Sequence, residues 1–210
     1  MSAARNNILK KIRMALTQST PLPFPATDNN SSVVQPLQQD IIVEFAEQFT
    51  KLQGKFAFCI DATELFEQFE TLRRQEGWTK VFKKGDLLPG LVDDSFWTDD
   101  LVNCDVSVTD CEALVARTGS LVLSAANSGG RLTSVYAPIH VCVAYTSQLV
   151  YDLSDALAAL TKKYGNTLPS LVTFATGPSR TADIEKTLVT GVHGPKEVYL
   201  FLVDDLGAAS

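Results

Sequence analysis

Short, nearly continuous apolar segments alternate with amphipathic segments along most of this chain, and this alternation constrains the fold more than any other feature. The clearest apolar segments are His140–Tyr145, Leu171–Ala175 and Val198–Val203. A strand that reads as one apolar run is typical of a parallel sheet covered on both faces. The sequence therefore predicts an α/β fold, Rossmann-like, with a mostly parallel sheet flanked by helices.

Apolar periodicity predicts the elements around these strands. Thr109, with Glu112 at capping-box spacing, predicts the start of a short helix. The predicted helices cover residues 40–52, 61–75, 109–116, 152–164 and 181–190. The further predicted strands cover residues 56–60, 81–82, 104–108 and 121–124.

The N-terminal region is predicted to be separate from the main body. Residues 1–17 combine basic side chains with an apolar stripe and predict an amphipathic helical arm. Residues 18–38 are rich in Pro, Asn and Ser, which is typical of an extended linker. The body then covers residues 39–205, before a short tail at 206–210. We expect the arm to pack on a neighbour, in a homo-oligomer or another complex; a transit peptide or a membrane-surface helix is the alternative.

Composition argues against several functions. The net charge of −6 disfavours a nucleic-acid surface. No apolar run approaches the ~20 residues of a membrane span, and the first residues lack the apolar centre of a secretory signal. The four cysteines form no CxxC pair, so we expect buried thiols in a reducing cytoplasm, and neither a metal nor a cofactor. They are Cys59, Cys104, Cys111 and Cys142.

Residues 171–195 hold the most distinctive polar residues. A strand runs into Thr-Gly-Pro-Ser-Arg-Thr at 176–181, which is predicted to open directly into a helix. The first turn of a helix leaves N–H groups unpaired, so this loop is predicted to bind an anion. Ser179 or Thr181 would cap the helix, Arg180 would clamp a carboxylate or phosphate, and Asp183 would orient Arg180. The alternative is a capped turn with a solvated arginine, where Asp183 only compensates the helix dipole.

In parallel sheets, ligands bind beyond the carboxyl ends of the strands, where the Gly177 loop is expected. His193 lies between two glycines, which let the backbone approach a ligand. An imidazole can give or take a proton near neutral pH, so His193 is the candidate catalytic residue; the alternative is a loop histidine bonded to the backbone. His140, which opens a strand, either faces the same cleft or is structural.

Thr118, Gly119 and Ser120 form a turn between two predicted elements. Their hydroxyl groups can bind an anion beside a glycine, and the alternative is a plain tight turn. The sequence contains no GxGxxG, Walker A, GxSxG or HExxH motif. Residue chemistry alone therefore names no reaction.

Four segments together resemble the LUD-domain family of lactate-utilisation proteins, and specifically its small C-type subunit. They are RTGSLVL at 117–123, APIHV at 137–141, TGPSRTADIE at 176–185 and GVHGP at 191–195. The resemblance covers roughly residues 40–205. Arg117 is a departure, because it stands where the family often has an acidic residue.

This resemblance implies a fold similar to the sugar-phosphate isomerase and CoA-transferase superfamily. It also implies a bacterial cytoplasmic role in oxidising L-lactate to pyruvate, alongside two iron–sulfur partner proteins. The chain would then be a non-redox subunit that binds a small anionic ligand. Two alternatives stay open: a stand-alone enzyme on a sugar phosphate or an acyl-CoA-like anionic substrate, and a pure assembly factor.

Overall fold

The computed structural model describes residues 3–17, 36–84, 95–126, 130–182 and 188–207. The chain divides into two compact units, Met1–Pro36 and Leu37–Ser210. In the first unit, α1 (Ala3–Leu16) is the helix that the sequence predicts. Its apolar side chains include Ile8, Ile12 and Met14, all of which are exposed.

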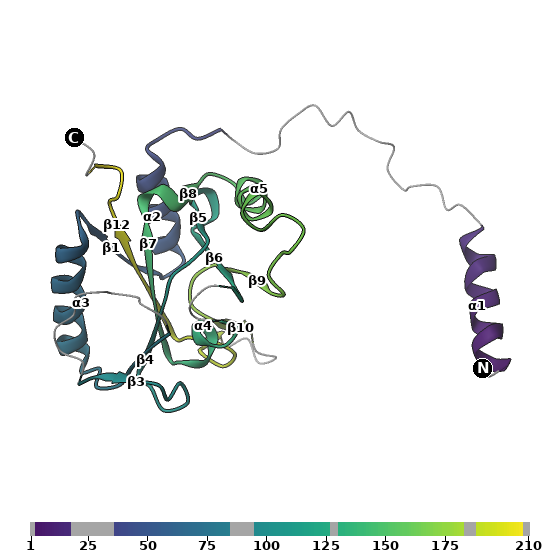
Figure 1. Cartoon of the computed structure of the whole chain (residues 1–210), viewed down its shortest axis with the longest axis horizontal. Helices are drawn as coiled ribbons and strands as arrows, with labels where there is room; N and C mark the ends of the chain where they lie inside the picture. Colours follow the sequence, from purple (N-terminus) through teal and green to yellow (C-terminus); the bar gives the residue numbers. More distant parts are fainter. Residues whose placement is uncertain (1–2, 18–35, 85–94, 127–129, 183–187, 208–210) are drawn as a thin grey trace. The chain divides into compact units, whose positions relative to one another are not determined.

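A six-stranded sheet forms the centre of the second unit (Figure 1). Its strands follow the order β1-β12-β7-β4-β2-β3, and every neighbouring pair is parallel. They are β1 (Lys55–Cys59), β2 (Val81–Lys83), β3 (Trp97–Thr98), β4 (Val106–Thr109), β7 (Ile139–Tyr145) and β12 (Glu197–Val203). The predicted mostly parallel sheet is confirmed.

A second sheet has four strands in the order β8-β5-β6-β9. β6 is antiparallel to both β5 and β9, whereas β8 is parallel to β5. They are β5 (Ala113–Val115), β6 (Ser120–Ser124), β8 (Leu149–Val150) and β9 (Val172–Ala175). Two further strands, β10 (Arg180–Ala182) and β11 (Leu188–Thr190), pair antiparallel with each other.

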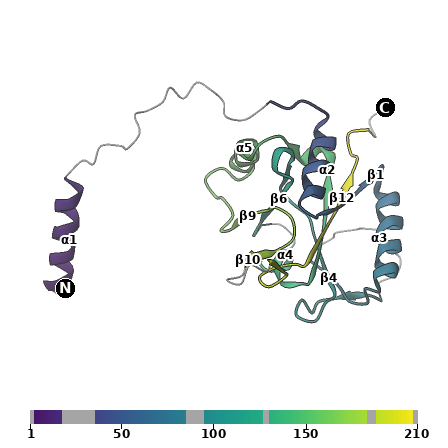
Figure 2. The same ribbon diagram turned by 180° about the vertical axis from the view of Figure 1, so that it is seen from behind.

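Three long helices cover the sheets: α2 (Ile41–Lys51), α3 (Ala62–Glu76) and α5 (Leu153–Tyr164). Each begins after an aspartate, Asp40, Asp61 or Asp152, whose carboxylate accepts a main-chain N–H of the first turn. Figure 2 shows α3 and α5 on opposite sides of the two sheets. The short helices are α4 (Thr133–Tyr136), η1 (Ala116–Thr118) and η2 (Thr146–Gln148). Within the described part of the chain, no helix combines the length and the apolarity that crossing a bilayer requires.

Side chains alternate across the central sheet and so create separate apolar layers. On β7, Val141 and Val143 join the cluster that packs against α3, whereas Cys142 and Ala144 join the cluster between the two sheets and α2. A third cluster packs the second sheet against α5. His140 has the same parity as Cys142, so it faces the second sheet.

The predicted helix over 109–116 is wrong, because β4 ends at Thr109 and β5 follows at Ala113. Glu112 does not close a capping box. Its buried carboxylate instead accepts hydrogen bonds from Ser124 Oγ, Tyr164 OH (2.6 Å) and Lys163 Nζ (2.7 Å). The β-branched residues of Val106–Thr109 are fully or nearly fully buried, and such residues favour strands.

All four cysteines are buried and free, as predicted. Burial raises the pKa of the Cys59 thiol to about 11, so this thiol stays protonated at neutral pH. Among the residues that the structure describes, no three His, Cys, Asp or Glu side chains gather as a metal site.

Candidate functional site

A cavity of about 150 Å³ lies at the amino ends of β7 and β12, between these strands and the β6–β9 pair. Both histidines of the chain, His140 and His193, line it. The remaining described lining consists of apolar, hydroxyl-bearing and glycine residues, with no Lys, Arg, Asp or Glu. The cavity therefore joins two imidazoles to a largely apolar space.

His140 is the second residue of β7 and is only 1% exposed. Its Nε2 lies 2.8 Å from Thr109 Oγ1 on the neighbouring strand β4. Burial lowers the pKa of His140 to about 4, so the imidazole is neutral at physiological pH. A neutral imidazole with one nitrogen held by a hydroxyl group can serve as a fixed hydrogen-bonding partner for a ligand.

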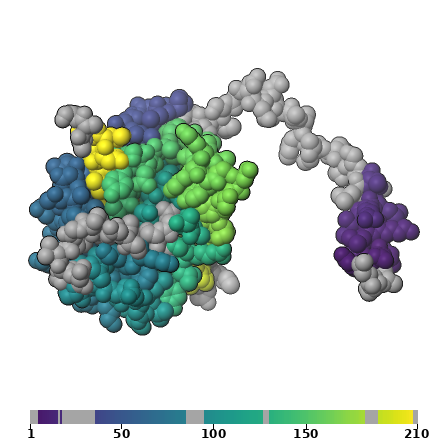
Figure 3. All heavy atoms as spheres, in the orientation of Figure 1, coloured from purple at the N-terminus to yellow at the C-terminus, as the bar shows by residue number. Residues whose placement is uncertain are grey.

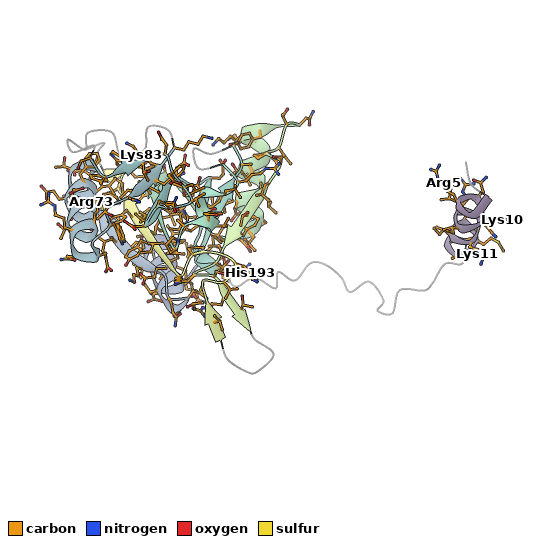
Figure 4. All side chains as sticks on the ribbon, turned by 90° about the horizontal axis from the view of Figure 1, so that it is seen from below. Arg5, Lys10, Lys11, Arg73, Lys83 and His193 are labelled. Atoms are coloured by element: carbon orange, nitrogen blue, oxygen red, sulfur yellow. The ribbon has the colours of Figure 1, made fainter. Side chains whose placement is uncertain are left out.

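Main-chain hydrogen bonds bring the His193 segment to the cavity. Ser179 N–H donates to Pro195 O (2.9 Å), and Gly191 N–H donates to Ser179 O (3.0 Å). Lys196 N–H donates to Pro138 O at 2.8 Å, which ties this segment to the start of β7. Figure 4 shows His193 beside the base of the β10–β11 pair. These bonds place Ser179 and His193 in one lining.

Two glycines permit this close packing. Gly177 has a φ of 82°, and an added Cβ would lie 2.7 Å from Leu52 O. A Cβ added at Gly194 would lie 3.0 Å from Ser179 Cβ. Both glycines line the cavity, so their lack of a side chain shapes it.

The predicted helix over 181–190 is wrong. Arg180 pairs with Thr190 and Ala182 with Leu188, in two antiparallel strands. The helix N-terminus that was expected to bind an anion is therefore absent from the described residues of this segment. Asp183 lies outside the described residues.

Arg180 and Thr181 do not belong to the described lining of the cavity. Arg180 Nη2 donates to Leu52 O at 2.7 Å, at the C-terminal end of α2. A cation there satisfies a carbonyl that the helix leaves open. Thr181 pairs with Val189 in the β10–β11 pair.

Thr118, Gly119 and Ser120 form a turn against α2, outside the described lining of the cavity. Gly119 has a φ of 59°, and an added Cβ would lie 2.6 Å from Phe49 N. Ser120 Oγ is 2.8 Å from both Thr118 Oγ1 and Thr176 Oγ1. The turn thus braces the residue before Gly177.

Arg117 has a local partner. Its Nη2 donates to Asp152 Oδ1 at 2.8 Å, and its N–H donates to Tyr151 O. Asp152 is also the N-cap of α5. The positive charge at this position is therefore matched within the turn and helix start that surround it.

The histidine cavity lies at the opposite end of the parallel sheet from the carboxyl ends, where a ligand site was expected. Gly177 follows β9, which belongs to the mixed sheet, so it does not lie beyond the carboxyl end of a strand of the parallel sheet. Sequence reasoning also missed Thr109, the partner of His140, and Ser134 and Thr173 in the lining. The usable signal was Ser107 and Thr109 alternating with valines in a buried strand.

A larger cavity of about 220 Å³ lies between β1 and α3, with Lys55 at its edge. Lys55 Nζ donates to Glu197 Oε2 (2.6 Å) and to Tyr199 OH (2.5 Å), and Tyr199 OH donates to Glu197 (2.9 Å). Because these polar groups bind one another, the smaller cavity at the two histidines is the better candidate site.

The LUD domain family model matches residues 74–203. A solved structure of a DUF162 family protein from Deinococcus radiodurans has a TM-score of 0.60 and 18% sequence identity, over 78% of this chain and 96% of that chain. At this identity the likeness concerns the fold alone.

Several curated relatives each match about half of this chain. Lactate utilization protein C of Halalkalibacterium halodurans is 36% identical over 48% of this chain and 45% of that protein. Lactate utilization protein C of Bacillus subtilis is 34% identical over 48% of this chain and 43% of that protein. An uncharacterized protein of Neisseria meningitidis is 32% identical over 52% of this chain and 47% of that protein. The chain spans about half the length of the curated relatives it matches.

Proposed function

This chain belongs to the LUD domain family, and we propose that it takes part in bacterial lactate utilisation as a non-redox component that binds a small anionic ligand. The names of the curated relatives support the pathway. The observation that carries the ligand site is the meeting of both histidines of the chain, from distant segments, in one small cavity.

A monocarboxylate is the ligand class that suits this cavity. The cavity of about 150 Å³ is small beside the ~300–1,000 Å³ of sites for drug-sized ligands, so it suits a ligand of few atoms. Burying a carboxylate is costly unless hydrogen bonds replace its water. Ser179 Oγ, the main chain near Gly194 and the His193 imidazole are among the described groups that can supply them.

The two histidines take different roles in this proposal. His140 is neutral and held by Thr109, so it orients the ligand. His193 lies on a segment between glycines, at the cavity but outside the sheet, and we assign to it the proton that is held or moved at the ligand. Redox centres would belong to iron–sulfur partner proteins in the cytoplasm.

A stand-alone enzyme on a sugar phosphate or an acyl-CoA-like substrate receives less support. Such ligands carry phosphate charges that proteins usually meet with Arg, Lys or a helix N-terminus. The described lining contains none of these, and Arg180 is bonded to Leu52 O.

Thermal unfolding with L-lactate, pyruvate, acetate or a sugar phosphate tests the ligand site. A ligand that binds only the folded state raises its stability by about 2.7 kcal/mol at 100 times Kd. We expect L-lactate or pyruvate to raise Tm for the wild type and for Val192→Ala, a change at an exposed neighbour, but not for His193→Asn. A rise with the sugar phosphate alone would favour the stand-alone enzyme.

Cells lacking the gene test the pathway separately. We expect L-lactate-dependent dye reduction to fall in these cells and to recover with the wild type or Val192→Ala. His193→Asn, produced at equal level, should not restore it. Unchanged dye reduction in the deleted cells would contradict the lactate role, whatever the binding experiment shows.

A further inference from the structure

The outer edge of β9 is open to another strand. Leu171 O accepts from Ala125 N–H, so Leu171 faces β6, and alternate residues along a strand face opposite neighbours. The N–H and C=O groups of Val172 and Phe174 therefore face away from β6. Among the described residues, none bonds to these groups. In Figure 1, β9 has β6 on one side only, and Figure 3 shows the yellow-green segment containing it at the surface.

The opposite situation holds at the edge strand of the parallel sheet. On the outer side of β1, Phe58 O accepts from Gln68 Nε2, and Ile60 N–H donates to Glu64 Oε2. Helix α3 thus occupies main-chain groups that another strand would need. Proteins commonly protect edge strands in such ways, and β9 has no equivalent protection in the described structure.

The segment that contains β9 carries no charge of its own. Residues 165–179 contain no Asp, Glu, Lys, Arg or His, although the chain has a net charge of −6. Leu168 and Leu171, which precede the strand, are 54% and 40% exposed. Arg131, whose Nη2 donates to Ser170 Oγ at 2.6 Å, is a charged side chain bonded to this segment. No acidic group of the segment itself therefore opposes the approach of a second copy of this acidic chain.

We propose that β9 is a dimer interface, where it pairs antiparallel with β9 of a second copy. A two-fold axis through Thr173 would set Val172 of one copy opposite Phe174 of the other, so the open donors and acceptors satisfy one another. A β-branched residue opposite an aromatic one is also a favourable cross-strand pair. The two mixed sheets become one continuous sheet.

This dimer would bring the two candidate sites together. Thr173 and Ala175 of β9 face inward and line the histidine cavity. Pairing along β9 therefore fixes one wall of each cavity and sets both cavities beside the same two-fold axis. The interface does not depend on which ligand the cavity binds.

Sedimentation velocity of the full chain over a concentration series tests the interface. We expect a dimer for the wild type and a monomer for Val172→Pro, which removes an outward N–H. The matched control is Val150→Pro on β8, the other edge of the same sheet, because Val150 and Val172 pack against the same cluster. A monomeric wild type at tens of micromolar, or a Val172→Pro variant that is folded and still dimeric, would overturn the proposal.

A cross-linking experiment remains decisive if Val172→Pro does not fold. Residues at the axis would form a pair without hydrogen bonds, with Cα atoms about 4.5 Å apart, which a disulfide can span. We expect Thr173→Cys to form a covalent dimer under mild oxidation, and Ser154→Cys, at an exposed position on α5, to stay monomeric on a denaturing gel. A dimeric protein without a cross-link at position 173 would assign the interface elsewhere.

Discussion

The two ends of the parallel sheet both carry polar side chains, but these have different partners. At the carboxyl ends of β7 and β12, Asp205 accepts from Thr146 Oγ1 (2.8 Å) and Ser147 Oγ (2.6 Å), and Asp204 accepts main-chain N–H groups. At the amino ends of the same strands, His140 and His193 line a cavity.

This difference distinguishes polar groups that stabilise the fold from polar groups that a ligand can reach. The carboxyl end of a parallel sheet is the usual ligand site, yet here its described acids and hydroxyls bind one another. At the amino end, Lys55, Glu197 and Tyr199 likewise bind one another, whereas the two histidines line a cavity. The cavity lined by the two histidines, rather than the number of polar residues, therefore favours the amino end as the ligand site.

The largest expected effect concerns the backbone that forms the cavity. Gly177→Ala should lower the free energy of unfolding by about 3 kcal/mol, since it combines a positive φ with a Cβ 2.7 Å from Leu52 O. Gly77→Ala is the control: it also has a positive φ, but nothing lies within 4 Å of the added Cβ. It should cost about 1 kcal/mol. Urea unfolding measures both variants, and equal losses of unfolding free energy for Gly177→Ala and Gly77→Ala would contradict the close packing at Gly177.

The pH dependence of stability tests the burial of His140. Its pKa is about 4 in the folded state and about 6.5 when unfolded, so the unfolded state binds more protons between these values. Stability should therefore fall as pH falls, by about 2 kcal/mol between pH 6.5 and 5. NMR of the two imidazoles, assigned with His193→Asn, checks this directly. A His140 ring that titrates near pH 6.5 would contradict the burial of this side chain.

Thr109→Val should have a smaller effect on the same end of the sheet. The change keeps the shape but removes the hydroxyl at 2.8 Å from His140 Nε2. Leaving a buried polar group without this bond costs about 1–3 kcal/mol. Thr161→Val, on the exposed face of α5, is the control and should cost less than about 0.5 kcal/mol. Urea unfolding measures the free energy of unfolding of both variants. Equal losses would show that the Thr109–His140 contact contributes no more stability than an exposed hydroxyl group does.

Local periodicity predicts much of this fold. The apolar runs give β7 and β12, and helical spacing gives α2, α3 and α5, because each depends on residues close in sequence. The motif containing Gly177 and Ser179 and the one containing His193 also lie in one cavity, as expected from their shared segment.

Long-range pairing explains what the sequence could not predict. Thr109 has the spacing of a helix cap, and only the alignment of β4 with β7 brings it to His140. The segment after Gly177 has helix-starting residues, yet Arg180 and Thr181 enter an antiparallel pair that is joined through Ser179 and Gly191. Such contacts override local propensity, so both helices were wrongly predicted.

The smallest expected effect lies at the carboxyl end. Asp205→Ala removes the acceptor shared by Thr146 and Ser147. Because Asp205 is exposed, water replaces much of the lost bonding, and the free energy of unfolding should fall by about 1 kcal/mol or less. Ligand-induced stabilisation should be unchanged, whereas His193→Asn should abolish it. If Asp205→Ala instead removed the ligand effect and left stability intact, the site would lie at the carboxyl end and the comparison between the two ends would reverse.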